Sequence, residues 1–133
     1  MFPAQQSTRL ILVLTLVLLC GCRHQSAPAT QNLTISYEVS PLPARVGDVT
    51  ITIKMKDGGS NEPIAGARIK LEGNMSHAGM APVFADAKEI GAGQYRTKMK
   101  LSMPGDWYVL VHLTLPDGRE LEQEFEIKEV APA

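Results

Sequence analysis

Residues 49–56 read VTITIKMK, and this stretch decides the fold class because apolar and polar side chains alternate along it without interruption. One parity is apolar and comprises Val49, Ile51, Ile53 and Met55, whereas threonines and lysines occupy the other. A period of two is the pattern of a β-strand with one face buried and one face in water. We therefore expect a strand here, with these four side chains in the core.

The same alternation recurs on both sides of this stretch. It runs through residues 33–39, 67–71, 95–103, 107–115 and 121–127, and a further strand is expected near residues 83–90. Turn-forming residues separate these segments, and Pro116-Asp117-Gly118 is a strong hairpin signal. The sequence therefore predicts an all-β protein, an immunoglobulin-like β-sandwich of six to seven antiparallel strands.

The residues before this domain predict export and a lipid anchor. Arg9 precedes an apolar run at residues 10–19 (LILVLTLVLL), which as a helix would span roughly 16 Å, short of a bilayer core of about 30 Å. Such a run is typical of a signal peptide. The following Leu19-Cys20-Gly21-Cys22 resembles the lipobox that the lipoprotein signal peptidase recognises. We assign residues 1–21 to the signal peptide and Cys22 to lipidation; an ordinary signal peptide with nearby cysteines is the alternative.

The organisation of the rest of the chain follows from this assignment. Residues 22–32 comprise the lipidated cysteine and a polar, flexible tether, and residues 33–130 form the folded domain. Cleavage would leave that domain without a thiol, because Cys20 and Cys22 are the two cysteines of the sequence. Arg23 rather than aspartate follows Cys22, which in a Gram-negative cell implies the outer membrane, with the domain facing the periplasm. The sequence has no basic stripe that would indicate nucleic-acid binding.

One segment carries donors for a soft metal. Residues 75–80 read MSHAGM, and neither methionine was expected to continue the alternation of a core strand. In an extended backbone Met75 and His77 would share a face, and Gly79 would let the chain turn so that Met80 approaches them. Thioether and imidazole donors suit Cu(I). Met103, at a strand end beside a Pro-Gly turn, is the fourth candidate ligand.

The remaining candidate residues favour structural roles. Met55 and Met99 lie within alternating strands and are expected in the core, as is Trp107, the single tryptophan. His112 has the outward parity, and the sequence identifies no partner for it. No spacing suggests a catalytic triad, and the mature domain would lack a cysteine nucleophile, so we expect no enzyme activity.

Four motifs together resemble a known family. They are Gly66-Ala67-Arg68-Ile69, residues 74–80 (NMSHAGM), residues 91–95 (GAGQY) and residues 103–107 (MPGDW), in the order found in YtkA-like domains, which are similar to FixH proteins of cytochrome-oxidase maturation. The resemblance implies an immunoglobulin-like sandwich and a connection to copper or cation handling. It maps the methionine–histidine segment to Met75, His77 and Met80, and the turn to Met103 and Trp107. Unlike FixH proteins, this chain is expected to have a lipid anchor and no retained transmembrane helix.

Two functions remain as hypotheses from the sequence. In the first, the chain is a lipid-anchored envelope protein that holds Cu(I) through Met75, His77, Met80 and Met103, for buffering or delivery. In the second, residues 74–85 form a docking loop for an envelope transporter or an oxidase-assembly partner, and the methionines provide an adaptable apolar surface. A purely structural envelope lipoprotein is a third option.

Overall fold

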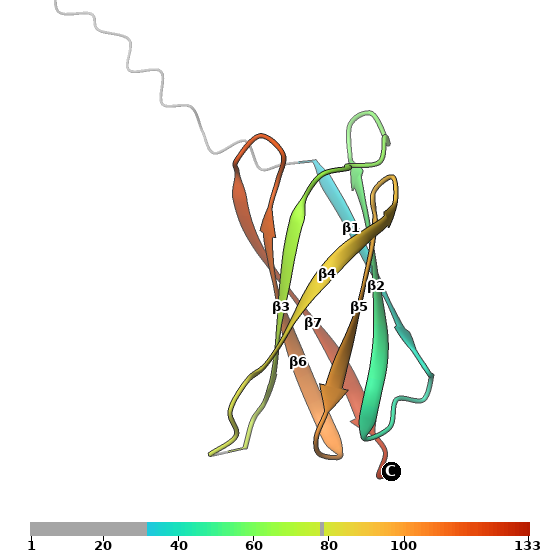
Figure 1. Cartoon of the computed structure of the whole chain (residues 1–133), viewed down its shortest axis with the longest axis vertical. Helices are drawn as coiled ribbons and strands as arrows, with labels where there is room; N and C mark the ends of the chain where they lie inside the picture. Colours follow the sequence, from blue (N-terminus) through green and yellow to red (C-terminus); the bar gives the residue numbers. More distant parts are fainter. Residues whose placement is uncertain (1–31, 78) are drawn as a thin grey trace, which may run out of the picture. The chain divides into compact units, whose positions relative to one another are not determined.

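The computed structural model describes residues 32–77 and 79–133, which form an all-β domain (Figure 1). The strands are β1 (Leu33–Ser40), β2 (Gly47–Asp57), β3 (Arg68–Met75), β4 (Val83–Gly91), β5 (Gln94–Leu101), β6 (Gly105–Thr114) and β7 (Glu120–Val130). They pair in the order β1-β2-β5-β4-β3-β6-β7, and every pairing is antiparallel. The predicted immunoglobulin-like sandwich of six to seven antiparallel strands is confirmed, with seven strands. The strand expected near residues 83–90 is β4.

Strand β4 connects the two layers of the sandwich. Its first part, from Val83 to Ala87, pairs with β3, whereas Lys88 to Gly91 pair with β5, with a register shift between Glu89 and Gly91. In Figure 1 this strand runs diagonally from the β3 side to the β5 side of the domain. One layer therefore contains β1, β2 and β5, and the other contains β3, β6 and β7, with β4 contributing to both.

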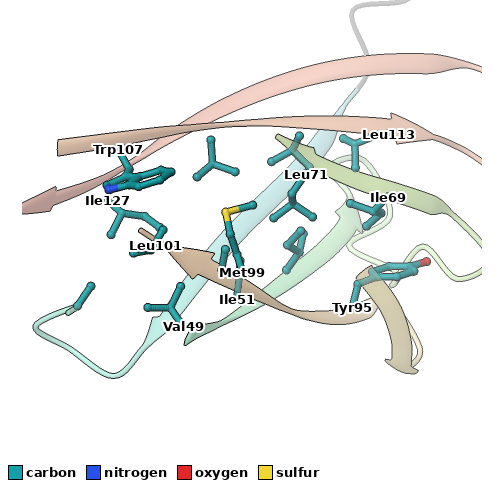
Figure 2. Close-up of a cluster of buried hydrophobic side chains, with 14 of the residues drawn as sticks. Val49, Ile51, Ile69, Leu71, Tyr95, Met99, Leu101, Trp107, Leu113 and Ile127 are labelled. Carbon is teal, nitrogen blue, oxygen red and sulfur yellow. The ribbon is translucent and has the colours of Figure 1, made fainter. Parts of the chain in front are cut away.

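The core fills the space between these layers, as Figure 2 shows. All four apolar side chains of β2 have an exposed fraction of 0%, because the alternation turns each of them inward. Gly73 in β3 makes room for Met99 of β5: a Cβ at position 73 would lie 2.7 Å from the Met99 sulfur. Met55, Met99 and Trp107 are all buried, as the sequence predicts.

The two outer strands of the pairing order, β1 and β7, approach each other. The rings of Tyr37 and Phe125 stack with their centroids 4.4 Å apart. The backbone amide of Val46 donates to the carbonyl of Ala131 at 2.8 Å, and the amide of Ala131 donates to the carbonyl of Ala44 at 2.9 Å. These contacts cover part of both edges, so the sandwich is nearly closed between β1 and β7.

Several sequence predictions lie outside the described residues. They are the signal peptide at 1–21, the lipidation site at Cys22 and all of the tether except Asn32. Within residues 32–77 and 79–133, no helix is long and apolar enough to cross a membrane.

Candidate functional site

Two distant methionine segments meet at one end of the sandwich. Strand β3 pairs with β6 so that Met75 lies opposite Trp107. The indole Nε1 of Trp107 donates to the carbonyl oxygen of Met103 at 3.0 Å, which ties the β5–β6 turn to the same place. The β3–β4 connection leaves from this end as well (Figure 1). The register of β3 and β6 therefore brings the sequence-predicted donors into one region.

The structure corrects the prediction for Met75. Its side chain is only 7% exposed and belongs to the core. Met75 has the same parity as Ile69 and Leu71, so it does continue the inward alternation of β3. The intervening inward position is Gly73, which has no side chain and therefore hid the pattern. The end of the Met75 side chain packs against Gly105, where a Cβ would lie 3.2 Å from Met75 Cε. Gly105 also has a positive φ of 116°, which favours glycine at this position.

The backbone around His77 also differs from the extended arrangement expected. Strand β3 ends at Met75, and Ser76 and His77 follow as exposed bends. His77 consequently does not continue the face of Met75 along a strand. The chain does turn at Gly79, where φ is 84°, and the amide of Met80 donates to the carbonyl of His77 at 3.4 Å. Met80 is partly buried against the core.

Met103 is much more accessible to solvent than Met75. Its side chain is 40% exposed on the β5–β6 turn, whereas Met99, four residues earlier, is 1% exposed. The described residues contain no group of three or more histidine, cysteine, aspartate or glutamate side chains that could hold a metal ion. Metal binding at this end would therefore depend on thioether sulfur, with His77 as the nitrogen donor.

Comparison with known proteins identifies the family. A profile described as YtkA-like matches residues 29–112, which is more than half of the chain and includes all four candidate donors. The chain belongs to the YtkA-like family. The resemblance inferred from the four sequence motifs is thereby confirmed. A search of curated protein sequences finds no match.

Two solved structures are similar to this YtkA-like chain at low sequence identity. MtrC from Shewanella baltica OS185 aligns with a TM-score of 0.47 and 14% identity, over 77% of this chain and 22% of its own. Murine CRIg aligns with a TM-score of 0.43 and 12% identity, over 75% of this chain and 98% of its own. The YtkA-like chain thus spans about a fifth of the length of MtrC.

The YtkA-like domain also has a polar cluster that the sequence did not reveal. His112 lies on the outer face of β6, where Nε2 is 3.3 Å from Glu72 Oε2 and Nδ1 is 3.2 Å from Glu122 Oε2. The outward parity of all three residues was visible in the sequence, but the register that makes them neighbours was not. The two carboxylates contact opposite nitrogens of the ring, so in this arrangement the cluster does not chelate a single ion.

Two tyrosines of the YtkA-like domain have contrasting environments. The Tyr95 hydroxyl donates to the carbonyl of Ile64 at 2.8 Å and accepts from the amide of Ala67 at 3.0 Å, fixing the connection before β3. Burial raises the pKa of Tyr95, although the hydrogen bond from the Ala67 amide acts in the opposite direction. Burial also raises the pKa of Tyr37, and the Tyr37 hydroxyl is buried without a hydrogen-bond partner among the described residues. Neither residue lies at the methionine end.

Proposed function

We propose that this YtkA-like protein is a lipid-anchored bacterial envelope protein that binds Cu(I) at the methionine end of its sandwich. The observation that supports this most is the convergence of two methionine segments: Met75 lies opposite Trp107, whose indole holds the carbonyl of Met103. Thioether sulfur is a soft donor that suits Cu(I) and, unlike a thiolate, has no proton to lose. Copper buffering or delivery, rather than catalysis, is the role that fits a site without an acid–base pair.

The four candidate donors would contribute differently. Met103 and His77 are exposed and Met80 is partly buried, so these three are the donors that an ion from solvent would meet first. Met75 lies beneath them in the core, next to Gly105. Its sulfur would join the site from below only if its side chain rotated within the packing. We therefore assign the main part of the binding to Met80, Met103 and His77.

A titration of Cu(I) against a competing chelator tests this assignment. The variants Met80→Leu and Met103→Leu remove a sulfur while keeping a similar apolar volume. We expect each to weaken binding by about tenfold or more, equivalent to about 1.4 kcal/mol. Met55→Leu is the matched control, because it makes the same chemical change at a buried position near the other end of the sandwich, opposite Ile35 of β1. Unchanged affinity in the Met80→Leu, Met103→Leu double variant, or no binding tighter than micromolar, would refute the proposal.

The lipid anchor is a separate part of the proposal with its own test. It is supported by the apolar run that ends at Leu19-Cys20-Gly21-Cys22. Two or three acyl chains would hold the protein firmly, at about 0.8 kcal/mol per buried CH₂. Mass spectrometry of the protein extracted from membranes should find the N-terminal peptide beginning at Cys22 with acyl chains attached, and Cys22→Ser should abolish them. An unmodified Cys22 in membrane-extracted protein would exclude the anchor.

A second candidate function is supported by exposed apolar side chains at the same end. Leu42, in the β1–β2 connection, is 76% exposed, and Met103 is 40% exposed. Together with residues 74–85, which were expected to be a loop but whose ends belong to β3 and β4, they would form an adaptable docking surface for an envelope transporter or an oxidase-assembly protein. Co-purification of such a partner that Leu42→Ser disrupts, and that a copper chelator leaves intact, would favour this function over metal binding.

A further inference from the structure

The outer faces of the two layers carry opposite charge. On the layer of β1, β2 and β5, exposed cations line β2, β5 and the last part of β4; they are Lys54, Lys56, Lys88, Arg96, Lys98 and Lys100. We call this surface the basic face. The carboxylates of these strands are Glu38, which contacts Lys54 at 3.5 Å, Asp48, which lies opposite Lys100 in the register, Asp57 at the end of β2 and Glu89 in β4. Asp57 and Glu89 have the inward parity of their strands, and Glu89 accepts from the amide of Gly66 at 3.2 Å.

The outer face of the other layer is acidic. Strand β7 presents glutamates at alternating positions, and β3 and the first part of β4 add two further carboxylates; the six are Glu72, Asp86, Glu120, Glu122, Glu124 and Glu126. The cations of this layer are fewer, and one of them, Lys128, contacts Glu126 at 2.9 Å. The formal net charge of −1 therefore conceals two faces of opposite sign.

The cations of the basic face form a broad array rather than a closed site. The register places Arg96 beside Lys88 on one side and Thr52 on the other, and Lys98 lies opposite Thr50. The Arg96 Nε donates to the Thr52 hydroxyl at 3.4 Å, so this guanidinium has a neutral partner. Such an array leaves most of its charge available to an extended anionic surface, which attracts each nearby lysine or arginine independently.

An apolar side chain lies among these cations. Ile90 in β4 is 47% exposed and lines a shallow groove of about 330 Å³ together with three cations, Lys88, Arg96 and Lys98, and one carboxylate, Asp86 from the first part of β4. Lysine and arginine side chains bury their methylene stems against apolar surface and keep their charges in the headgroup region. An exposed apolar residue beside three cations, with a single carboxylate lining the same groove, is therefore suited to the boundary between headgroups and acyl chains.

We propose that the basic face lies on the anionic lipid headgroups of the membrane. This proposal depends on the lipid anchor proposed above in one respect: the anchor holds the domain close to the membrane. The chain enters the domain at Leu33, the first residue of β1, which belongs to the same layer as the basic face. The ten residues between Cys22 and Leu33 can span up to about 35 Å when extended. The longest dimension of the basic face is similar, because β2 has 11 residues at about 3.3 Å each. The tether therefore permits the domain to lie flat.

Amine labelling of the full-length protein in vesicles tests this orientation. The protein, extracted with its native N-terminus, is reconstituted into vesicles of phosphatidylcholine alone or with about one-third phosphatidylglycerol, and lysine acetylation is followed by mass spectrometry. We expect Lys88, Lys98 and Lys100 to react at least about threefold more slowly on the anionic vesicles, and Lys70 and Lys128 of the acidic layer to react at unchanged rates. Raising the salt to about 0.5 M should remove the protection, because the Debye length then falls to about 4 Å.

Matched charge reversals on the two layers separate the effect of the basic face from the effect of the protein's net charge. Lys98→Glu with Lys100→Glu should abolish the protection of Lys88, whereas Lys70→Glu with Lys128→Glu changes the net charge equally and should preserve it. Equal labelling on both lipids, or equal protection of both layers, would overturn the proposal. Protection in native membranes but not in anionic vesicles would also overturn it, in favour of an acidic protein partner. Flotation of the protein with neutral vesicles tests the lipid anchor alone. If the protein does not float with neutral vesicles, the anchor is absent, and lysine labelling in the presence of anionic vesicles, compared with labelling in buffer, still tests the basic face.

Discussion

Truncation of Met75 should destabilise the domain, although the residue sits in the segment of candidate metal donors. Its side chain is 7% exposed, lies opposite Trp107 and has its Cε close to Gly105. Buried Met→Ala changes cost about 2–5 kcal/mol, since they remove apolar contacts and leave a cavity. Because Met75 ends its strand, the neighbouring connection can relax into part of that space, so we expect the lower half of the range, about 2–3 kcal/mol.

Urea unfolding followed by tryptophan fluorescence measures this cost at the site itself. Trp107 is the single tryptophan of the chain, is 1% exposed and pairs with Met75. A loss of about 2–3 kcal/mol should lower the urea midpoint by about 1–2 M. Met75→Leu should cost less than about 1.5 kcal/mol, because it preserves volume. Met103→Ala, at a 40% exposed side chain, should change stability by about 0.5 kcal/mol or less.

A small effect of Met75→Ala would refute the packing argument. If the variant loses less than about 1 kcal/mol, and so resembles Met103→Ala, then the Met75 side chain does not fill the space beneath Trp107. The end of β3 would then be part of the loop, as the sequence alone suggested. If Met75→Leu costs as much as Met75→Ala, the sulfur rather than the apolar volume would be the stabilising feature.

Three further changes test other contacts. Tyr95→Phe removes two hydrogen bonds and should cost about 1–3 kcal/mol in urea unfolding, whereas Tyr37→Phe removes an unpartnered hydroxyl and should be neutral or stabilising. Gly93→Ala should cost at least about 2 kcal/mol, because φ is 68° and its Cβ would lie 2.6 Å from a backbone oxygen; Gly118→Ala, with φ of 88° and open space around it, should cost about 1 kcal/mol in the same assay. Hydrogen bonds from Ser60 and Gly59 lower the Asp57 pKa from its ordinary 3.8, so the stability it contributes is present above that pH and lost as the pH falls through the lowered pKa. Asp57→Asn should flatten that part of the pH–stability curve measured by thermal unfolding.

The strands were predictable from the sequence because burial on one face imposes a period of two. The run at residues 49–56 identifies the inward side chains of β2 directly, and all four are buried. The inward position of Met75 is not evident from the sequence, because Gly73 occupies the preceding inward position without a side chain and interrupts the parity that begins at Ile69. Met99 of β5 fills the space at Gly73. The sequence alone does not reveal this contact, because the two residues are far apart along the chain.

Features that depend on register between distant strands were not predictable. His112 was correctly expected to face outward, but its contacts with Glu72 and Glu122 require the pairing of β6 with both β3 and β7. Parity alone likewise reveals that lysines of β5 and glutamates of β7 face outward. It does not reveal that these strands belong to different layers, because that separation arises from the crossing of β4 between them.

The two proposed surfaces together constrain how the domain can stand relative to a membrane. The chain enters at Leu33, whereas the methionine end is at the far side of the strands, about 36 Å away along the 11 residues of β2. A domain standing on its N-terminal end would present Met80 and Met103 far from the lipid, to partners that are soluble in the periplasm. A domain lying on its basic face would bring Met103, which follows β5 of that layer, closer to the headgroups and to partners within the membrane. If the proposed copper site exists, the labelling of Lys98 would therefore also discriminate between these two kinds of proposed partner.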